Sequence, residues 1–120
     1  MGNRATIEIQ DYSGDAPAYI YLHWNGSPEA VIEAVKAAAP RMRKSDASYA
    51  TARLIGELHN RIEGGLSLGV TKAKAEWREQ WDNGHYTIDL GAGRIEQTCF
   101  VDADTTATAI VAEGLEFSNC

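Results

Sequence analysis

The chain has 120 residues, of which 44% are hydrophobic, and a formal net charge of −6. This length is typical of one domain, and the composition excludes a disordered chain. No apolar run approaches the roughly 20 residues that span a bilayer, and no apolar signal core follows Met1. With only two cysteines and no sign of secretion, we expect a cytoplasmic protein that does not bind membranes.

The hydrophobic pattern of the first 24 residues predicts a β-hairpin. Apolar and polar residues alternate over 5–10 and again over 18–24, and a turn-rich link joins the two runs. In the second run Ile20, Leu22 and Trp24 face one side, and Tyr19, Tyr21 and His23 face the other.

Two helices are expected to follow the hairpin. Ser27 caps the first helix, and Pro40 ends or kinks it. Asp46 lies at the cap of a second helix, which runs to about Glu63 and ends at Gly64.

The second half of the chain predicts a short strand over 66–70 and a second hairpin with strands over 85–90 and 94–101. Residues 72–81 fit either a helical turn or a structured loop. The segment 103–120 fits either a short helix or an extended arm, because its threonines oppose a helix while its alanines favour one.

Strand pairs that flank two helices indicate the α+β class. We expect one domain over 1–120, with an antiparallel sheet of four to five strands and two helices packed on one face.

None of the motifs that mark catalysis is convincing in this chain. The histidines and cysteines lack the paired short spacing of a zinc site. Cys99 and His85 could meet on neighbouring strands, but a cysteine in the middle of a strand is more typical of packing than of catalysis. Gly91-Ala92-Gly93 lies between two strands, whereas a phosphate cradle needs a following helix. We therefore predict no enzyme activity, no metal and no cofactor.

The negative charge lies in the last third of the chain. Residues 1–81 carry ten acidic and ten basic residues, whereas residues 82–120 carry seven acidic residues and one base, Arg94. An acidic region repels phosphates and attracts basic surfaces, so we expect no direct binding of nucleic acid. The alternative is that the acidity only keeps a small protein soluble.

These features predict a surface that binds a partner protein. Aromatic side chains anchor protein interfaces, and acidic side chains steer basic partners. The alternative is that an antiparallel sheet simply keeps one polar face in water. We place these residues on the candidate surface: Asp82, Asp89, Glu96, Asp102, Asp104, Glu113, Glu116, Tyr19, Tyr21 and His23.

Four short segments carry a family resemblance: GNRATI over 2–7, YLHWNG over 21–26, GLSLG over 65–69 and DNG over 82–84. In this order they resemble a set of small phage and prophage proteins, over residues 2–90. The YLHWNG segment is the most specific of them, and the acidic stretch after Phe100 departs from the pattern.

Small acidic phage proteins include anti-CRISPR inhibitors, many of which occupy the DNA-binding surfaces of Cas proteins. The resemblance thus implies a DNA-mimicking inhibitor that binds a Cas effector subunit through its acidic surface and blocks target DNA engagement. One alternative is a small-ligand or nucleotide-binding module, in which Tyr21 and Trp24 stack a base near His23 and His85. Another is a phage structural or assembly protein, either a monomer or a homodimer.

Overall fold

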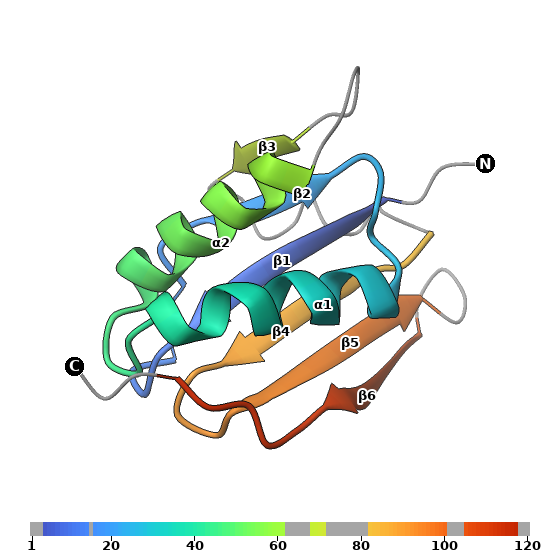
Figure 1. Ribbon diagram of the computed structural model, residues 1–120. Coiled ribbons are helices and arrows are strands. Elements are labelled where there is room, and N and C mark those ends of the chain that lie inside the picture. The colour runs from blue at the N-terminus through green and yellow to red at the C-terminus, as the bar shows by residue number, and fades with distance from the viewer. Residues whose placement is uncertain (1–3, 15, 62–67, 72–81, 101–104, 118–120) are drawn as a thin grey trace.

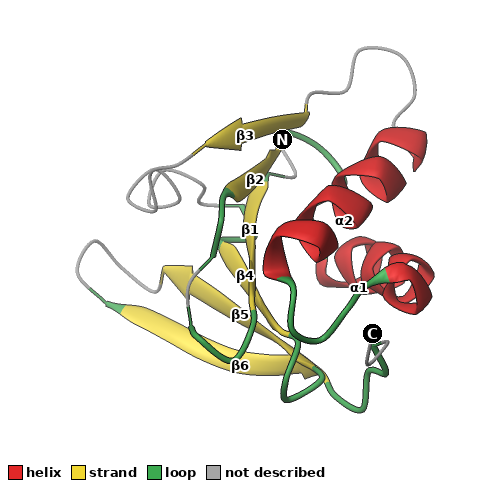
Figure 2. Cartoon of the chain, turned by 90° about the vertical axis from the view of Figure 1, so that its left-hand side faces the viewer, coloured by secondary structure: helices red, strands yellow, loops and turns green. Residues whose placement is uncertain are grey.

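The computed structural model describes residues 4–14, 16–61, 68–71, 82–100 and 105–117. In these residues a mixed sheet forms one layer, and two helices form a second layer on one of its faces (Figures 1 and 2). The elements are β1 (Ala5–Gln10), β2 (Tyr19–Leu22), α1 (Pro28–Ala38), a 3-10 turn (Ala39–Arg41), α2 (Ala47–Arg61), β3 (Leu68–Thr71), β4 (His85–Asp89), β5 (Arg94–Phe100) and β6 (Thr106–Ala112). None of the described helices is long and apolar enough to cross a membrane.

The expected α+β class is confirmed, as is the packing of two helices on one face, but the expected sheet is wrong in two respects. The sheet has six strands in the order β3-β2-β1-β4-β5-β6, and β1 pairs with β4 in parallel. The second hairpin pairs with the edge of β1 that β2 leaves free, so buried Tyr86 and Ile88 of β4 lie beside Ile7 and Ile9. The chain between β1 and β4 is long enough to serve as the crossover that a parallel pair requires.

The core lies between the sheet and the helices. Alternate residues of the central strands point into it, including Ile7, Ile20 and Ile88, which are fully buried. Val35 of α1 and Leu54 of α2 face them from the other layer. The period of two therefore places the apolar residues of the central strands on the side that faces the helices, although Thr6 and Glu8 on the other side of β1 are buried as well.

Local signals define where the helices begin. The Ser27 hydroxyl accepts a hydrogen bond from the Ala30 amide at 3.4 Å, with Pro28 in the first turn of α1. The Asp46 carboxylate accepts from the Tyr49 amide at 2.9 Å, which caps α2. Pro40 falls in the 3-10 turn, where it ends α1 as expected.

The segment that was expected as a short helix or an extended arm contains a strand. β6 pairs antiparallel with β5, in a register that sets Thr108 against Thr98 and Ile110 against Glu96. The helix alternative is therefore wrong over Thr106–Ala112. The residues expected to form a helical turn or structured loop, 72–81, lie outside the described part of the chain.

Candidate partner-binding surface

The face of the sheet that points away from the helices collects the polar residues of each strand. The strand pairing aligns Tyr21, Thr6, His85, Thr98 and Thr108 in one row across this face. A second row contains Tyr19, Glu8, Thr87, Glu96 and Ile110. We call this side of the sheet the open face, because neither α1 nor α2 covers it (Figure 2).

The centre of the open face is a buried polar network, which the alternation of the sequence did not reveal. His85 Nδ1 lies 2.8 Å from the Thr6 hydroxyl, and His85 Nε2 lies 2.6 Å from Glu8 Oε1. The amide of Gln10 donates to the other carboxylate oxygen of Glu8 at 2.8 Å. Thr6, Glu8 and His85 are each at most 2% exposed, so they hold the strands together rather than meet a partner.

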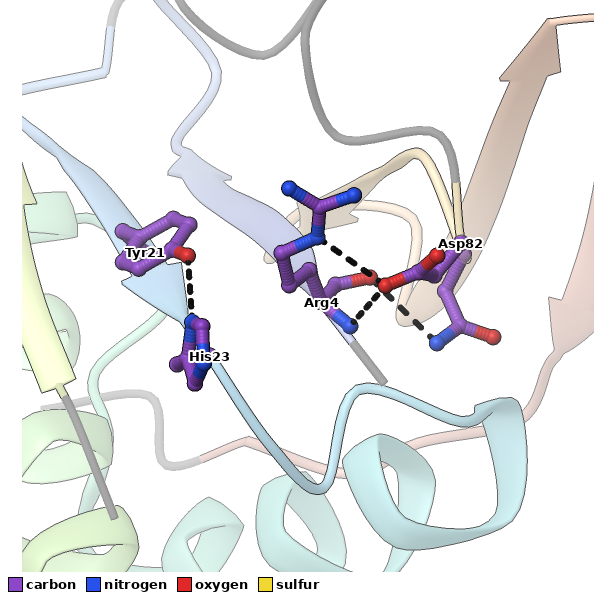
Figure 3. Close-up of polar contacts among 5 residues, drawn as sticks. Arg4, Tyr21, His23 and Asp82 are labelled. Carbon is purple, nitrogen blue, oxygen red and sulfur yellow. Dashed lines mark hydrogen bonds and ion pairs between the residues drawn. The ribbon is translucent and has the colours of Figure 1, made fainter. Parts of the chain in front are cut away.

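The three aromatic candidates lie along the β2 side of the open face. Tyr19 is half-buried, with its ring centroid 6.1 Å from that of His85. The Tyr21 hydroxyl and His23 Nδ1 are 2.9 Å apart, as Figure 3 shows. Tyr19, Tyr21 and His23 are therefore close together, as expected, but they lie several strands from the exposed acids.

Asp82 is neutralised by a base from the first part of the chain. Its carboxylate accepts from the backbone amide and from Nε of Arg4, both at 3.0 Å (Figure 3). These hydrogen bonds lower the pKa of Asp82. Because Asp82 precedes β4, it also lies at the opposite end of that strand from Asp89.

The remaining described acids of the last third lie toward the other end of the sheet, with Glu96 on the open face and residues 113–116 beside the β4–β5 turn. Asp89 ends β4, and one of its carboxylate oxygens accepts from the Ala92 amide at 3.0 Å. The Leu115 amide donates to the Gly93 carbonyl at 2.9 Å, which holds Glu113 and Glu116 beside the β4–β5 turn. We refer to Asp89, Glu96, Glu113 and Glu116 as the acidic cluster.

The acidic cluster is only weakly compensated within the described residues. Glu96 lies 3.8 Å from Nε of Arg94, which is an ion pair but too long for a hydrogen bond. Glu113 and Glu116 are exposed. The two other acids expected on the surface, Asp102 and Asp104, lie outside the described residues.

The sequence left a helix or an extended arm open for residues 103–120, and the structure has the strand β6 over Thr106–Ala112. Residues 105–110 are all exposed, and the side chain of Ile110 is 48% exposed. The helices cover the centre of the sheet and do not extend over β6, which pairs with β5 at the edge of the sheet (Figures 1 and 2). Alternation of threonine with alanine was the available signal, but such a pattern is too weakly apolar to predict a strand.

A cleft lies on the opposite side of the sheet, where β2 ends against the two helices. It has a volume of about 290 Å³ and an apolar floor formed by Leu22, Ala34 and Leu58. Trp24 and Arg61 line it as well, and the guanidinium of Arg61 is held by Glu33 and Glu57, both at 2.8 Å. Trp24, one of the residues expected to stack a base, therefore lines this cleft. His85, which was expected near the same base, lies instead in the buried network with Thr6 and Glu8.

Two further findings concern metal ligands and the thiol of Cys99. The described part of the chain contains no group of three or more histidine, cysteine or acidic residues that could hold a metal ion. Cys99 turns toward the Asn83 carbonyl, 3.7 Å away, while the neighbouring Thr98 shares the open face with His85. Burial raises the pKa of the Cys99 thiol, which disfavours the nucleophilic thiolate.

No protein-family model, curated protein or solved structure gives a match to this chain.

Proposed function

We propose that this chain is a protein-binding inhibitor of the anti-CRISPR type, which binds a Cas effector of the host cell and blocks target DNA engagement. The proposal that the chain binds a protein rests on one observation: residues 105–110 are exposed beside the acidic cluster. The choice of a Cas effector rests on the resemblance of the GNRATI, YLHWNG and DNG segments to small phage proteins.

Electrostatics supplies the mechanism of this proposal. A Cas effector grips the phosphates of its target through lysines and arginines. The acidic cluster presents carboxylates that compete for the same cations, and Glu113 and Glu116 make no ion pair within the described residues. β6, which has no charged residue, lies next to these carboxylates and can make apolar contacts with the effector. The phosphate backbone of DNA cannot make such contacts, so they favour the inhibitor in the competition.

The direct experiment mixes the protein with a purified Cascade-type effector and measures the affinity of that effector for its target DNA. We expect the affinity to fall as the inhibitor is added. Binding of the inhibitor to the effector, measured without DNA, should weaken as salt screens the carboxylates. An unchanged DNA affinity across the candidate effectors would contradict the proposal.

Charge reversal tests which residues act. The variant Glu113→Lys should bind the effector several-fold more weakly, mostly through a slower association rate. The matched control is Glu29→Lys on α1, whose carboxylate is also exposed but lies outside the acidic cluster. Equal losses for the two variants would show that net charge, rather than the acidic cluster, controls binding.

The cleft lined by Trp24 favours a second candidate function, a module that binds a small aromatic ligand such as a nucleotide. Its volume of about 290 Å³ is at the small end of ligand sites. A ligand present at a hundred times its Kd stabilises the folded state by about 2.7 kcal/mol, which a thermal-shift screen with nucleotides detects. Stabilisation that Trp24→Ala abolishes would support this function, and an unchanged Tm throughout the screen would remove it.

A further inference from the structure

The outer edge of β6 has the features of a sheet edge to which another strand can pair. β6 ends the sheet, and among the described residues only β5 pairs with it. The register from Phe100↔Thr106 to Glu96↔Ile110 is regular, so the backbone groups along this stretch alternate between β5 and the outer side. The outer side of the strand is therefore a row of hydrogen-bond donors and acceptors that face water.

Proteins normally protect such an edge, and β6 lacks the usual protection. Edge strands are commonly short, charged, interrupted by proline or bent by a bulge. β3, at the other edge of the sheet, has only four residues, whereas β6 has seven and contains neither a charged residue nor a proline. The register shift at Ile95/Glu96 bends only the final part of the β5–β6 pair.

The side chains of β6 leave room for a partner on both faces of the strand. Thr108 and Ile110 lie on the open face, and Ala107 and Ala109 lie on the other. Threonine and isoleucine pack well against β-branched residues of a neighbouring strand. The alanines are small enough that a strand added at this edge meets no steric obstacle from them.

The charges around β6 indicate what kind of strand fits it. Glu113 directly follows β6 and is exposed, and Glu96 lies one strand inward beside Ile110. With a net charge of −6, a second copy of this chain would bring more negative charge to these carboxylates. A cationic segment gains from the same groups, so electrostatics favours a basic partner over self-association.

We propose that β6 docks an extended segment of a basic partner protein, which adds to the sheet as a seventh strand. The segment has β-branched or apolar residues at alternate positions, facing Thr108 and Ile110, and lysine or arginine near the end that meets Glu113. Main-chain hydrogen bonds supply the affinity, and the flanking charges supply the orientation. This inference rests on the proposed protein-binding function and specifies how the partner is held.

The test uses the full-length chain, labelled with 15N, and synthetic peptides. The first peptide has a seven-residue core of alternating threonine and valine with two lysines at each end, and the second carries glutamates in place of the lysines. A third peptide repeats the lysine version with alternate backbone amides methylated, which removes the donors that strand pairing needs. NMR titration at millimolar peptide concentration then locates and quantifies binding.

We expect the lysine peptide to shift the backbone signals of Thr106–Ala112 and to slow their hydrogen exchange. The glutamate peptide and the methylated peptide should each bind about tenfold more weakly. Glu113→Lys should reduce the preference for the lysine peptide over the glutamate peptide, while the exposed control Glu29→Lys on α1 should reduce it less. Far-ultraviolet circular dichroism of each variant verifies that it is folded.

Three results would overturn the inference. Signals of β6 that do not move, or lysine and glutamate peptides that bind equally, show that β6 is not a docking edge for basic strands. Equal binding of the methylated peptide shows attraction of charge without strand pairing. A doubled mass in light scattering, with β6 signals that change on dilution, assigns the edge to a second copy. None of these results depends on a Cas effector, so the proposed inhibition can fail while strand addition stands.

Discussion

At the scale of single residues, a comparison of two glycines distinguishes the cost of a left-handed backbone from the cost of a steric clash. Gly14 and Gly84 both have positive φ angles, of +82° and +71°. A Cβ atom at Gly14 would meet nothing within 4 Å, whereas one at Gly84 would lie 2.1 Å from the Thr98 carbonyl oxygen. Of these two glycines, Gly84 therefore combines the left-handed conformation with neighbouring backbone that leaves no space for a side chain.

We expect Gly14→Ala to lower the free energy of unfolding by about 1 kcal/mol, the cost of the left-handed conformation. Gly84→Ala should cost about 2 kcal/mol more, because β4 and β5 must separate to admit the methyl group. Urea unfolding of both variants measures the difference. Equal losses would mean that the contact with Thr98 does not constrain this turn.

Asp82 gives the stability a defined dependence on pH. Its backbone and side-chain hydrogen bonds from Arg4 hold the pKa of Asp82 below the unfolded value of about 3.9. This contribution is therefore complete above the unfolded pKa and is lost as the pH falls through the lower folded pKa. Asp82→Asn should be less stable than the wild type above about pH 5, and the two should converge in acid.

Chemical unfolding at a series of pH values checks this prediction. Asp89→Asn is a suitable control, since Asp89 also lies at an end of β4 but forms no ion pair within the described residues. A stability difference between wild type and Asp82→Asn that stays constant down to pH 2 would contradict the assignment.

At the scale of the elements, the two helix caps differ in quality. The bond from the Tyr49 amide to Asp46 is 2.9 Å long, whereas that from the Ala30 amide to Ser27 is 3.4 Å long. We expect Asp46→Ala to cost about 1 kcal/mol, the usual value for a cap, and Ser27→Ala to cost about half of that. Thermal unfolding of the two variants tests the order, and a larger loss at Ser27 would reverse it.

The elements that the sequence predicted are those with strong local signals. Alternation at Ile7 and Ile9 identified β1, and the caps at Ser27 and Asp46 identified both helices. The parallel pairing of β1 with β4 could not be predicted in this way, because it is a contact between distant segments that no local pattern encodes. β6 was left ambiguous because the propensities of its threonines and alanines oppose each other.

The candidate surface was less predictable than the fold. Alternation placed Tyr19 and Tyr21 correctly on the open face, but it could not show that Glu8 and His85 are buried there. Counting charges could not reveal that Arg4 pairs with Asp82, since that ion pair joins residues far apart in the chain. The distribution of charge along a sequence becomes a distribution in space only after the strand order is known.

At the scale of the whole molecule, stability should decrease from the centre of the sheet toward β6. Ile7 and Ile88 are fully buried on the paired central strands β1 and β4, whereas residues 105–110 are exposed. We expect the amides of β6 to exchange with solvent at least about a thousandfold faster than those of β1. Hydrogen exchange followed by NMR measures the gradient, and uniform protection across the sheet would show that β6 unfolds only with the core.

The parallel contact between β1 and β4 also sets the order in which the protein can acquire its structure during synthesis. A nascent chain can form the first hairpin early, but β1 stays without its second neighbour until residue 89 has left the ribosome. Contacts of such high sequence separation slow folding, because a long loop must close before they form. Translation speed across the middle of the message therefore affects how long the unpaired edge of β1 is available to chaperones or to aggregation.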